Sequence, residues 1–215
     1  MAEQLVLPFE TRAARGRGDF IVAPCNEAAV RFIDRWPDWP VNAAAIHGPR
    51  GSGKSHLVQV WQARSNAAVI GAAELSDEMP ASLAIAVEDM GGEPTPARDR
   101  ALMSLFERKG HLLLTAERHP ADWPVAVADL KSRLAALPAF ALWAPDETLL
   151  RDLARKLFAD RQLKVADAAI ARMLTRLPRT PDAIQDFVAR LDRFALAERR
   201  PIGERLVGEL LDRET

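Results

Sequence analysis

The sequence predicts an α/β fold: a parallel five-stranded sheet flanked by helices, followed by a small all-helical domain. Three observations predict it. Short apolar runs alternate with amphipathic helical segments up to Pro145, and each run is apolar throughout, as in strands buried on both faces of a parallel sheet. A glycine-rich loop joins the first run to a helix. After Pro145, apolar residues recur only at helical spacing.

The α/β part begins with a helix that follows Asn26, a favourable N-cap residue. Further helices are expected after the first, third and fourth strands, and Gly110 ends the second of these helices. The expected strands are 41–47, 67–72, 83–90, 111–117 and 139–144.

Beyond the last strand, four amphipathic segments predict consecutive helices and no strand. They are 146–162, 165–177, 181–198 and 203–214. We therefore expect three parts, which are a flexible tail at 1–18, a nucleotide-binding α/β domain at 19–145 and a helical lid at 146–215.

Composition excludes several classes of protein. Of 215 residues, 48% are hydrophobic and 27% charged, which is an ordinary globular balance. The net charge of -1 provides no overall positive field for nucleic acid, so a DNA contact would need a local patch. The single cysteine, Cys25, cannot form a disulfide within the chain. Neither a membrane span nor a signal peptide is expected, so we predict a cytoplasmic protein.

The segment GPRGSGKS fits the phosphate-loop pattern G-x-x-x-x-G-K-[ST], with a strand before it and a helix after it. Its backbone N–H groups would point at phosphate oxygens, Lys54 would reach the β- and γ-phosphates, and Ser55 would hold Mg²⁺. A glycine-rich turn matching by chance is the alternative, which the flanking elements disfavour. The candidate residues are Gly48, Pro49, Arg50, Gly51, Ser52, Gly53, Lys54 and Ser55.

Acidic residues follow two of the expected strands. Glu88 and Asp89 end the third strand, and Glu117 ends the fourth. Ligands of parallel α/β sheets lie outside the carboxyl ends of the strands, so these acids are expected beside the loop. Glu88 and Asp89 are candidate catalytic acids, and Glu88 is a candidate Mg²⁺ ligand with Ser55. The alternative is a pair of solvated acids at a strand end.

An apolar run, QLVLPF, opens the chain and precedes a polar stretch without periodicity. Burying Leu5, Leu7 and Phe9 in another protein would gain roughly 1.5–3 kcal/mol each, but ordering the segment costs about 1–2 kcal/mol per residue. Such a peptide should bind a partner only weakly by itself, at about micromolar affinity. Alternatively, the run folds back as an edge strand on its own domain.

Four features, in this order, resemble the AAA+ domain of DnaA, the bacterial replication initiator. They are GKSHL at 53–57, the acids after the third strand, TAER at 115–118, and LKSRL at 130–134 before an all-helical lid. The resemblance implies a P-loop AAA+ fold that binds ADP or ATP with Mg²⁺.

Two departures from the initiator point to a narrower group. The chain ends after the lid, so no counterpart of the initiator's C-terminal DNA-binding domain is expected. The opening tail is similar to the Q-L-x-L-x-F peptides that dock on the bacterial sliding clamp. This combination resembles the Hda family of DnaA-related regulators. The clamp-binding candidates are Gln4, Leu5, Leu7, Pro8 and Phe9.

The resemblance assigns roles to several residues. Arg133 matches the arginine finger, which acts on a neighbour's nucleotide, although it could be an ordinary surface arginine. Glu88 replaces the family's metal-side Asp, and Glu117 replaces a sensing Asp. Asp182 falls where a sensor arginine is expected, with Arg179 as the alternative. These replacements imply weak intrinsic ATPase activity.

The remaining candidates are Phe20 and Ile21, which would line the adenine pocket or belong to the core, and His56, which follows the phosphate loop. The implied function is a clamp-tethered regulator that stimulates ATP hydrolysis by DnaA and so inactivates it. DNA contact would be indirect, through the clamp, and a homo-oligomer is possible. The alternatives are a helicase-loader-type or other AAA+ ATPase that acts directly on DNA, and a small-molecule kinase.

Overall fold

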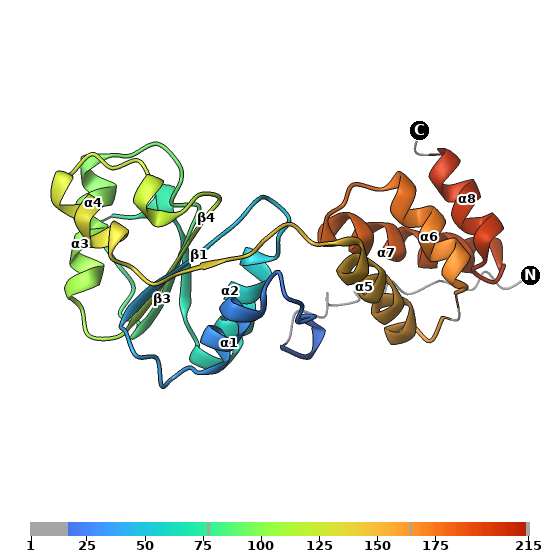
Figure 1. Cartoon of the computed structure of the whole chain (residues 1–215), viewed down its shortest axis with the longest axis horizontal. Helices are drawn as coiled ribbons and strands as arrows, with labels where there is room; N and C mark the ends of the chain where they lie inside the picture. Colours follow the sequence, from blue (N-terminus) through green and yellow to red (C-terminus); the bar gives the residue numbers. More distant parts are fainter. Residues whose placement is uncertain (1–16, 77, 164, 214–215) are drawn as a thin grey trace, which may run out of the picture.

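The computed structural model describes residues 17–76, 78–163 and 165–213. It contains one parallel five-stranded sheet of order β2-β3-β4-β1-β5, flanked by helices, and four further helices toward the C-terminus (Figure 1). This architecture confirms the fold class predicted from the sequence. The expected boundary between 145 and 146 falls just before the first of the four helices and stays an interpretation.

The elements are short and closely spaced. The strands are β1 Ala43–His47, β2 Ala68–Gly71, β3 Ala84–Glu88, β4 His111–Ala116 and β5 Ala139–Ala141. The α-helices are α1 Glu27–Asp34, α2 Lys54–Ser65, α3 Pro96–Glu107, α4 Ala128–Ala135, α5 Glu147–Asp160, α6 Asp167–Arg176, α7 Pro181–Glu198 and α8 Glu204–Arg213. Single 3-10 turns are η1 Arg17–Asp19, η2 Ala72–Glu74 and η3 Pro120–Asp122.

Helix α3 begins earlier than the apolar pattern predicts. The Thr95 side chain accepts a hydrogen bond from the Arg98 N–H at 3.1 Å, and Pro96 occupies the first helical position. A threonine cap followed by proline is a strong helix start, because the cap satisfies a free N–H and proline has none to satisfy. The apolar pattern of DRALMSLFERKG predicts a helix from Asp99, so the extra turn adds Pro96–Arg98 at its start.

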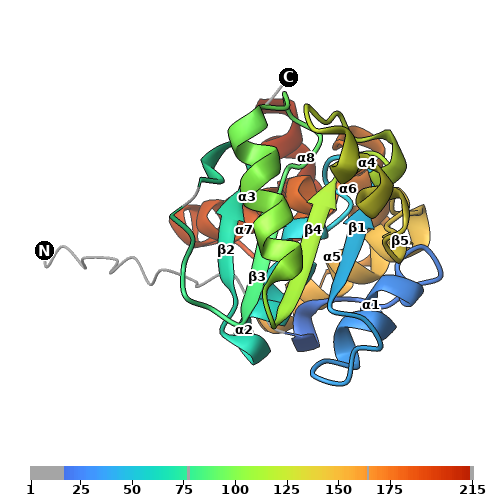
Figure 2. The ribbon, with the colours of Figure 1, turned by 90° about the vertical axis from the view of Figure 1, so that its left-hand side faces the viewer.

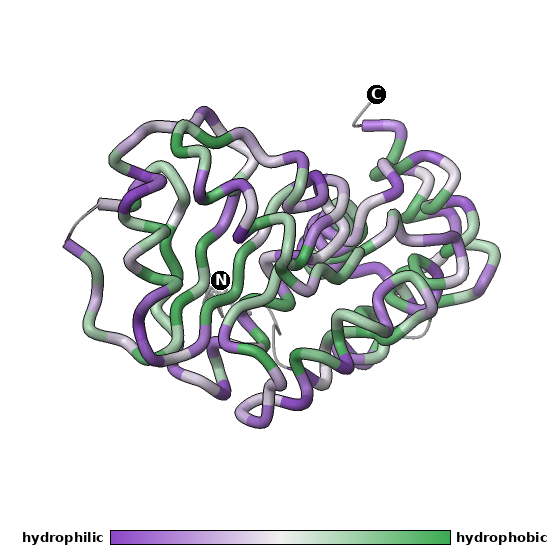
Figure 3. The backbone as a smooth tube through the Cα atoms, turned by 60° about the vertical axis from the view of Figure 1, so that its left-hand side comes forward, coloured by the Kyte–Doolittle hydropathy of each residue, from purple (hydrophilic) through white to green (hydrophobic). Residues whose placement is uncertain are grey.

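Because all strands of the sheet are parallel, their carboxyl ends lie at the same edge. Strand β4 pairs in parallel with both β1 and β3, and β1 also pairs with β5 (Figure 2). Helices α1 and α2 pack on one face of the sheet, and α3 and α4 pack on the other. The strand interiors are apolar in Figure 3, as expected for a sheet covered on both faces.

The four C-terminal helices have a core of their own. Leu150, Phe158, Ile170, Phe187 and other apolar residues of α5–α8 form one buried cluster, separate from the two clusters that cover the sheet. No helix in the described part of the chain has the length and apolar character needed to cross a bilayer.

Truncation of the helical core should be costly. Phe187→Ala removes a fully buried ring from α7 and should lower the free energy of unfolding by about 3–5 kcal/mol. Leu196→Ala is the matched control, because Leu196 lies on the same helix and is 67% exposed. Chemical denaturation checks both variants. Equal losses would contradict the assignment of α7's buried face.

Candidate functional site

The phosphate-loop segment runs between β1 and α2, and its glycines are required by close contacts. A Cβ on Gly48 would lie 2.0 Å from the carbonyl oxygen of Leu142, which follows β5. Gly53 starts α2 with φ of 97°, in the left-handed region that side chains disfavour. Gly48 N–H also donates to the Ala116 carbonyl at the end of β4. The loop is therefore held at the carboxyl edge of the sheet.

Lys54 folds back onto the loop that precedes it. Its ammonium donates to the carbonyl oxygens of Gly48 at 2.7 Å and Pro49 at 2.9 Å. Partial burial lowers the pKa of Lys54 from its ordinary value, and three nearby carboxylates oppose that shift. Those carboxylates belong to Glu117, Asp89 and Glu88. The Lys54 side chain thus lies between the loop and the acids.

Ser55 and Glu88 meet, although 33 residues separate them. The Ser55 hydroxyl donates to Glu88 Oε1 at 2.6 Å, which brings the two candidate Mg²⁺ ligands together. Asp89 follows with φ of 62°, a left-handed conformation that costs a non-glycine residue roughly 1–2 kcal/mol.

The Ser55 hydroxyl and the Glu88 carboxylate fit a magnesium site in which nucleotide phosphates supply the other ligands. Mg²⁺ prefers oxygen ligands and is usually held by one or two protein groups together with substrate phosphates. No cluster of three or more histidine, cysteine or acidic side chains in the described ranges could hold a metal. The Ser55–Glu88 pair therefore suits a site in which Mg²⁺ is held jointly by the protein and by a nucleotide's phosphates.

Two further candidates, Arg50 and Glu117, form an exposed ion pair beside the loop. Arg50 is 90% exposed at its side chain, and its guanidinium is 3.8 Å from the Glu117 carboxylate. Such an exposed pair contributes little to stability, so Arg50 remains free to turn toward a ligand. The Ser52 hydroxyl is buried and has no hydrogen-bond partner among the described residues.

The residues expected at the adenine differ in their surroundings. Phe20 is buried in the α/β core, where its ring contacts the His56 ring edge to face at 5.1 Å and covers Gly53. Ile21 is half-buried and packs on the helical core. Phe20 and Ile21 therefore connect the core of the α/β part to the core of the helical part. The Phe20 ring packs against the loop at Gly53.

The N-terminus of α7 contacts the loop directly. A Cβ on Gly51 would lie 2.9 Å from the Thr180 side chain, which caps α7 by accepting from Ala183 N–H. Arg179 and Asp182 are both exposed and flank Thr180. Thr180 thus brings the segment that carries both candidate sensor residues to the loop, and the choice between Arg179 and Asp182 stays a prediction.

Arg133 lies across the sheet from the helix that follows this loop. It belongs to α4, which packs on the opposite face of the sheet from α2 (Figure 1). Its side chain is 44% exposed, and its guanidinium is 3.6 Å from Glu107 of α3. The candidates in the tail, Gln4, Leu5, Leu7, Pro8 and Phe9, lie outside the described residues.

The sequence did not reveal three contributors to this site. The carbonyl oxygen of Leu142 lies beside Gly48, and the Thr180 side chain lies beside Gly51. A sequence motif does not reveal such contacts, because they join segments far apart in the chain. The third is a histidine pair: His47 ends β1, and its ring lies 5.1 Å from that of His119. Burial, and secondly the proximity of His119, lowers the pKa of His47.

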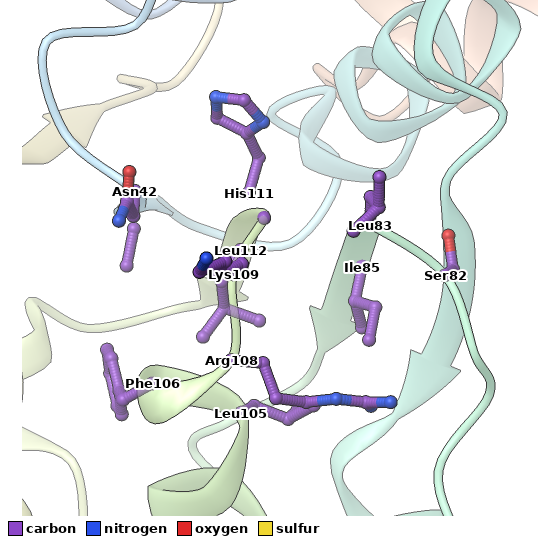
Figure 4. Close-up of a pocket in the computed structure, with 12 residues that line it drawn as sticks. Asn42, Ser82, Leu83, Ile85, Leu105, Phe106, Arg108, Lys109, His111 and Leu112 are labelled. Atoms are coloured by element: carbon purple, nitrogen blue, oxygen red, sulfur yellow. The ribbon is translucent and has the colours of Figure 1, made fainter.

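A separate hollow lies at the opposite edge of the sheet. It has a volume of about 20 Å³ and is lined by Leu83, Ile85, Leu105, His111 and neighbouring residues at the amino ends of β1, β3 and β4 (Figure 4). A space of that size holds about one water molecule. It is therefore no second ligand site.

Three solved structures share this fold at low sequence identity. Domain III of Thermotoga maritima DnaA matches with a TM-score of 0.72 and 14% identity over 93% of this chain and 96% of that one. DnaA bound to AMPPCP and single-stranded DNA matches at 0.70 and 15% over 81% of this chain, which spans 63% of that DnaA chain. The Thermotoga maritima RuvB branch migration motor matches at 0.68 and 15%, over 87% and 67%.

No protein-family model and no curated protein matches the sequence. The TM-scores of 0.68 to 0.72 establish a shared fold, which is the AAA+ fold of DnaA domain III and RuvB, and at identities of 14–15% the similarity shows the fold alone.

The histidine pair predicts a titration. His47 should titrate below the ordinary histidine value of about 6.5, because its burial disfavours the charged form. Since the folded pKa is depressed, this residue's contribution to stability is lost as the pH falls below about 6.5. NMR titration of the imidazole signals measures the midpoint.

His119→Ala is the matched variant for that titration. Removing the neighbouring ring should raise the His47 midpoint while leaving it below the ordinary value, because burial is the larger cause. A wild-type midpoint at or above about 6.5, or no movement in His119→Ala, would contradict the assignment.

Proposed function

We propose that this chain is a nucleotide-binding AAA+ regulator that holds ADP or ATP with Mg²⁺ and lends Arg133 to the nucleotide of a partner. The observation that carries the nucleotide part is the Ser55–Glu88 hydrogen bond of 2.6 Å beside a glycine loop that leads into α2. Within an AAA+ fold, this places a hydroxyl, a carboxylate and a helix N-terminus at one point. Two of the matching DnaA structures hold AMPPCP.

The loop residues would each contact a different part of the nucleotide–Mg²⁺ complex. Backbone N–H groups of Gly51–Ser55 would donate to phosphate oxygens, because α2 leaves its first N–H groups without helical partners. Lys54 would exchange its bonds to the Gly48 and Pro49 carbonyls for phosphate oxygens. Bound Mg²⁺ would neutralise phosphate charge, and Ser55 and Glu88 would be its protein ligands.

Hydrolysis by this chain itself would be weak. Glu88 has one more methylene than the aspartate found in related proteins, and Mg²⁺ tolerates little displacement of its ligands. Asp182, if it faces the phosphates, would repel the additional charge of ATP more than it repels ADP. Both features suit a protein that retains ADP.

Three features of Arg133 support a role in trans. It lies on the face of the sheet opposite α2, it is partly exposed, and it forms an ion pair with exposed Glu107. Exposed pairs of this kind are worth about 0–1 kcal/mol, so a partner's phosphate can displace Glu107. An arginine supplied in trans can accelerate phosphoryl transfer by about 10³–10⁵-fold.

For the partner, we propose the initiator DnaA, with the sliding clamp as tether through residues 4–9. The sequence of the tail and the order of motifs support this, and they point to regulators of the Hda and HdaA type. Stimulated hydrolysis would convert DnaA to its ADP form and so limit initiation. Weak binding by the tail alone favours a second contact, such as clamp loaded on DNA.

The alternative is an AAA+ ATPase that acts on DNA directly, as a helicase loader or motor does. The RuvB branch migration motor matches the fold almost as well as DnaA does. The two functions separate in one assay: direct action predicts ATP turnover stimulated by DNA alone, whereas the regulator requires DnaA and clamp-loaded DNA.

Lys54→Ala should weaken ADP and ATP binding by about tenfold or more, because it removes the cation nearest the expected phosphates. Lys109→Ala is the matched control, since Lys109 lies at the opposite edge of the sheet. Titration with a fluorescent ADP analogue measures both. Undiminished binding by Lys54→Ala would rule out the loop as the nucleotide site.

Arg133→Ala should fold and bind nucleotide normally yet lose stimulation of DnaA ATP hydrolysis, by up to about 10³-fold. Lys131→Ala, an exposed change on the same helix, should retain stimulation. Phosphate release from DnaA in the presence of clamp and DNA is the readout. Stimulation that survives in Arg133→Ala would reject the trans arginine.

Leu5→Ala/Phe9→Ala should lose clamp binding by about a hundredfold or more, since two large apolar side chains no longer enter the clamp. Arg12→Ala/Arg15→Ala removes charge from the same tail and should leave binding within a few-fold. A pulldown with purified clamp compares the two. Equal retention of both variants would disprove the tail as tether.

A further inference from the structure

Arg98 and Asp99, in the first turn of α3, form a buried ion pair. They are 3% and 0% exposed, and Arg98 Nε and Nη2 donate to Asp99 Oδ1 at 2.9 and 2.8 Å. A buried ion pair is weak evidence for stability, because apolar residues of similar volume often serve equally well. The role of this pair must therefore be sought in its bonds to other segments.

Arg98 also reaches two loops at the carboxyl edge of the sheet. Its Nη1 donates to the carbonyl oxygens of Gly92 at 3.2 Å and Glu93 at 3.4 Å, which follow β3. Its Nη2 donates to the Pro124 carbonyl at 2.7 Å, in the segment that leads to α4. One guanidinium thus holds the loop after the candidate acids and the entry to α4.

Asp99 holds the two residues that lead into α4. Its Oδ2 accepts from the N–H groups of Ala126 at 2.6 Å and Val127 at 3.0 Å. The N-cap position of α4 is Val127, whose side chain has no acceptor. A carboxylate from α3 therefore satisfies the N–H groups of the two residues just before α4 and fixes where the chain enters the helix.

A continuous chain of bonds connects the acids to α4. Gly92 N–H donates to the Asp89 carbonyl at 3.2 Å, Gly92 accepts from Arg98, and Asp99 then holds the start of α4. Toward its other end, α4 has the exposed pair of Arg133 with Glu107 of α3. Since exposed pairs contribute little, the polar contacts that place α4 lie mainly at its buried start, beside the core packing of Leu130 and Leu134.

We propose that Arg98 and Asp99 are a positioning pair, which transmits the nucleotide state at Glu88 and Asp89 to α4 and so to Arg133. The inference rests on the nucleotide site of the proposed function and not on the identity of the partner. Binding of nucleotide displaces the loop after β3, and the pair carries that displacement to the first turn of α4.

Arg98→Met/Asp99→Asn tests the pair while preserving the fold. It removes both charges together, so no unpaired charge stays buried. The amide oxygen introduced at position 99 can still accept from the N–H groups of Ala126 and Val127. Only the bonds that Arg98 makes are lost, including those to the loop after β3. Arg108→Met is the matched control, because Arg108 adjoins the other end of α3 and donates to the Pro80 carbonyl.

Amide hydrogen exchange of the full chain, with and without saturating MgADP, is the readout, and MgADP binding is measured in the same samples. In wild type and Arg108→Met, MgADP should slow exchange in residues 126–135 by about fivefold or more. In the double variant, exchange in residues 89–93 should still respond, while exchange in residues 126–135 should not. A purely structural role would change exchange equally with and without nucleotide.

The outcomes separate the two proposals. MgADP binding without a response of α4 in wild type, or with an undiminished response in the double variant, overturns the positioning pair alone. Absence of MgADP binding to wild type overturns the nucleotide site as well. Should the double variant unfold, Arg98→Lys, which keeps the charge but not the guanidinium fork, must reduce the response of α4; an unchanged response overturns the pair.

Discussion

The close packing around the phosphate loop is the constraint on which the rest of the structure depends. Gly48 leaves room only for the Leu142 carbonyl, and Gly51 leaves room only for Thr180. The first contact ties the loop to the strand at the end of the sheet, and the second brings the helical bundle onto it. Because neither glycine can be replaced without moving backbone or a capped helix, the loop fixes how the two cores meet.

Parallel strand pairing supplies the chemistry around that loop. Since β1, β3 and β4 all run in one direction, their carboxyl ends deliver Glu88, Asp89 and Glu117 to the same edge. No single segment of the chain contains this set. The same edge also carries the loop that Arg98 holds, so the candidate nucleotide site and the entry to α4 lie at one edge of the sheet.

The sequence predicted what depends on local pattern and missed several contacts between distant segments. Apolar runs and helical spacing were sufficient for the fold class, and the glycine motif located the loop. Strand order, the meeting of Thr180 with Gly51, and the bonds from the entry of α4 to Asp99 arise between segments far apart in the chain. Phe20 shows the limit at one residue, because an apolar side chain before a loop can line a pocket or support the loop from behind.

The most direct test of the central claim is an experimental structure of the full chain with MgADP. The account predicts the diphosphate within hydrogen-bond distance of the N–H groups of Gly51–Ser55, with the Lys54 ammonium moved from the Gly48 and Pro49 carbonyls onto phosphate. A nucleotide bound elsewhere, or a Lys54 that keeps both carbonyl bonds in the complex, would contradict it.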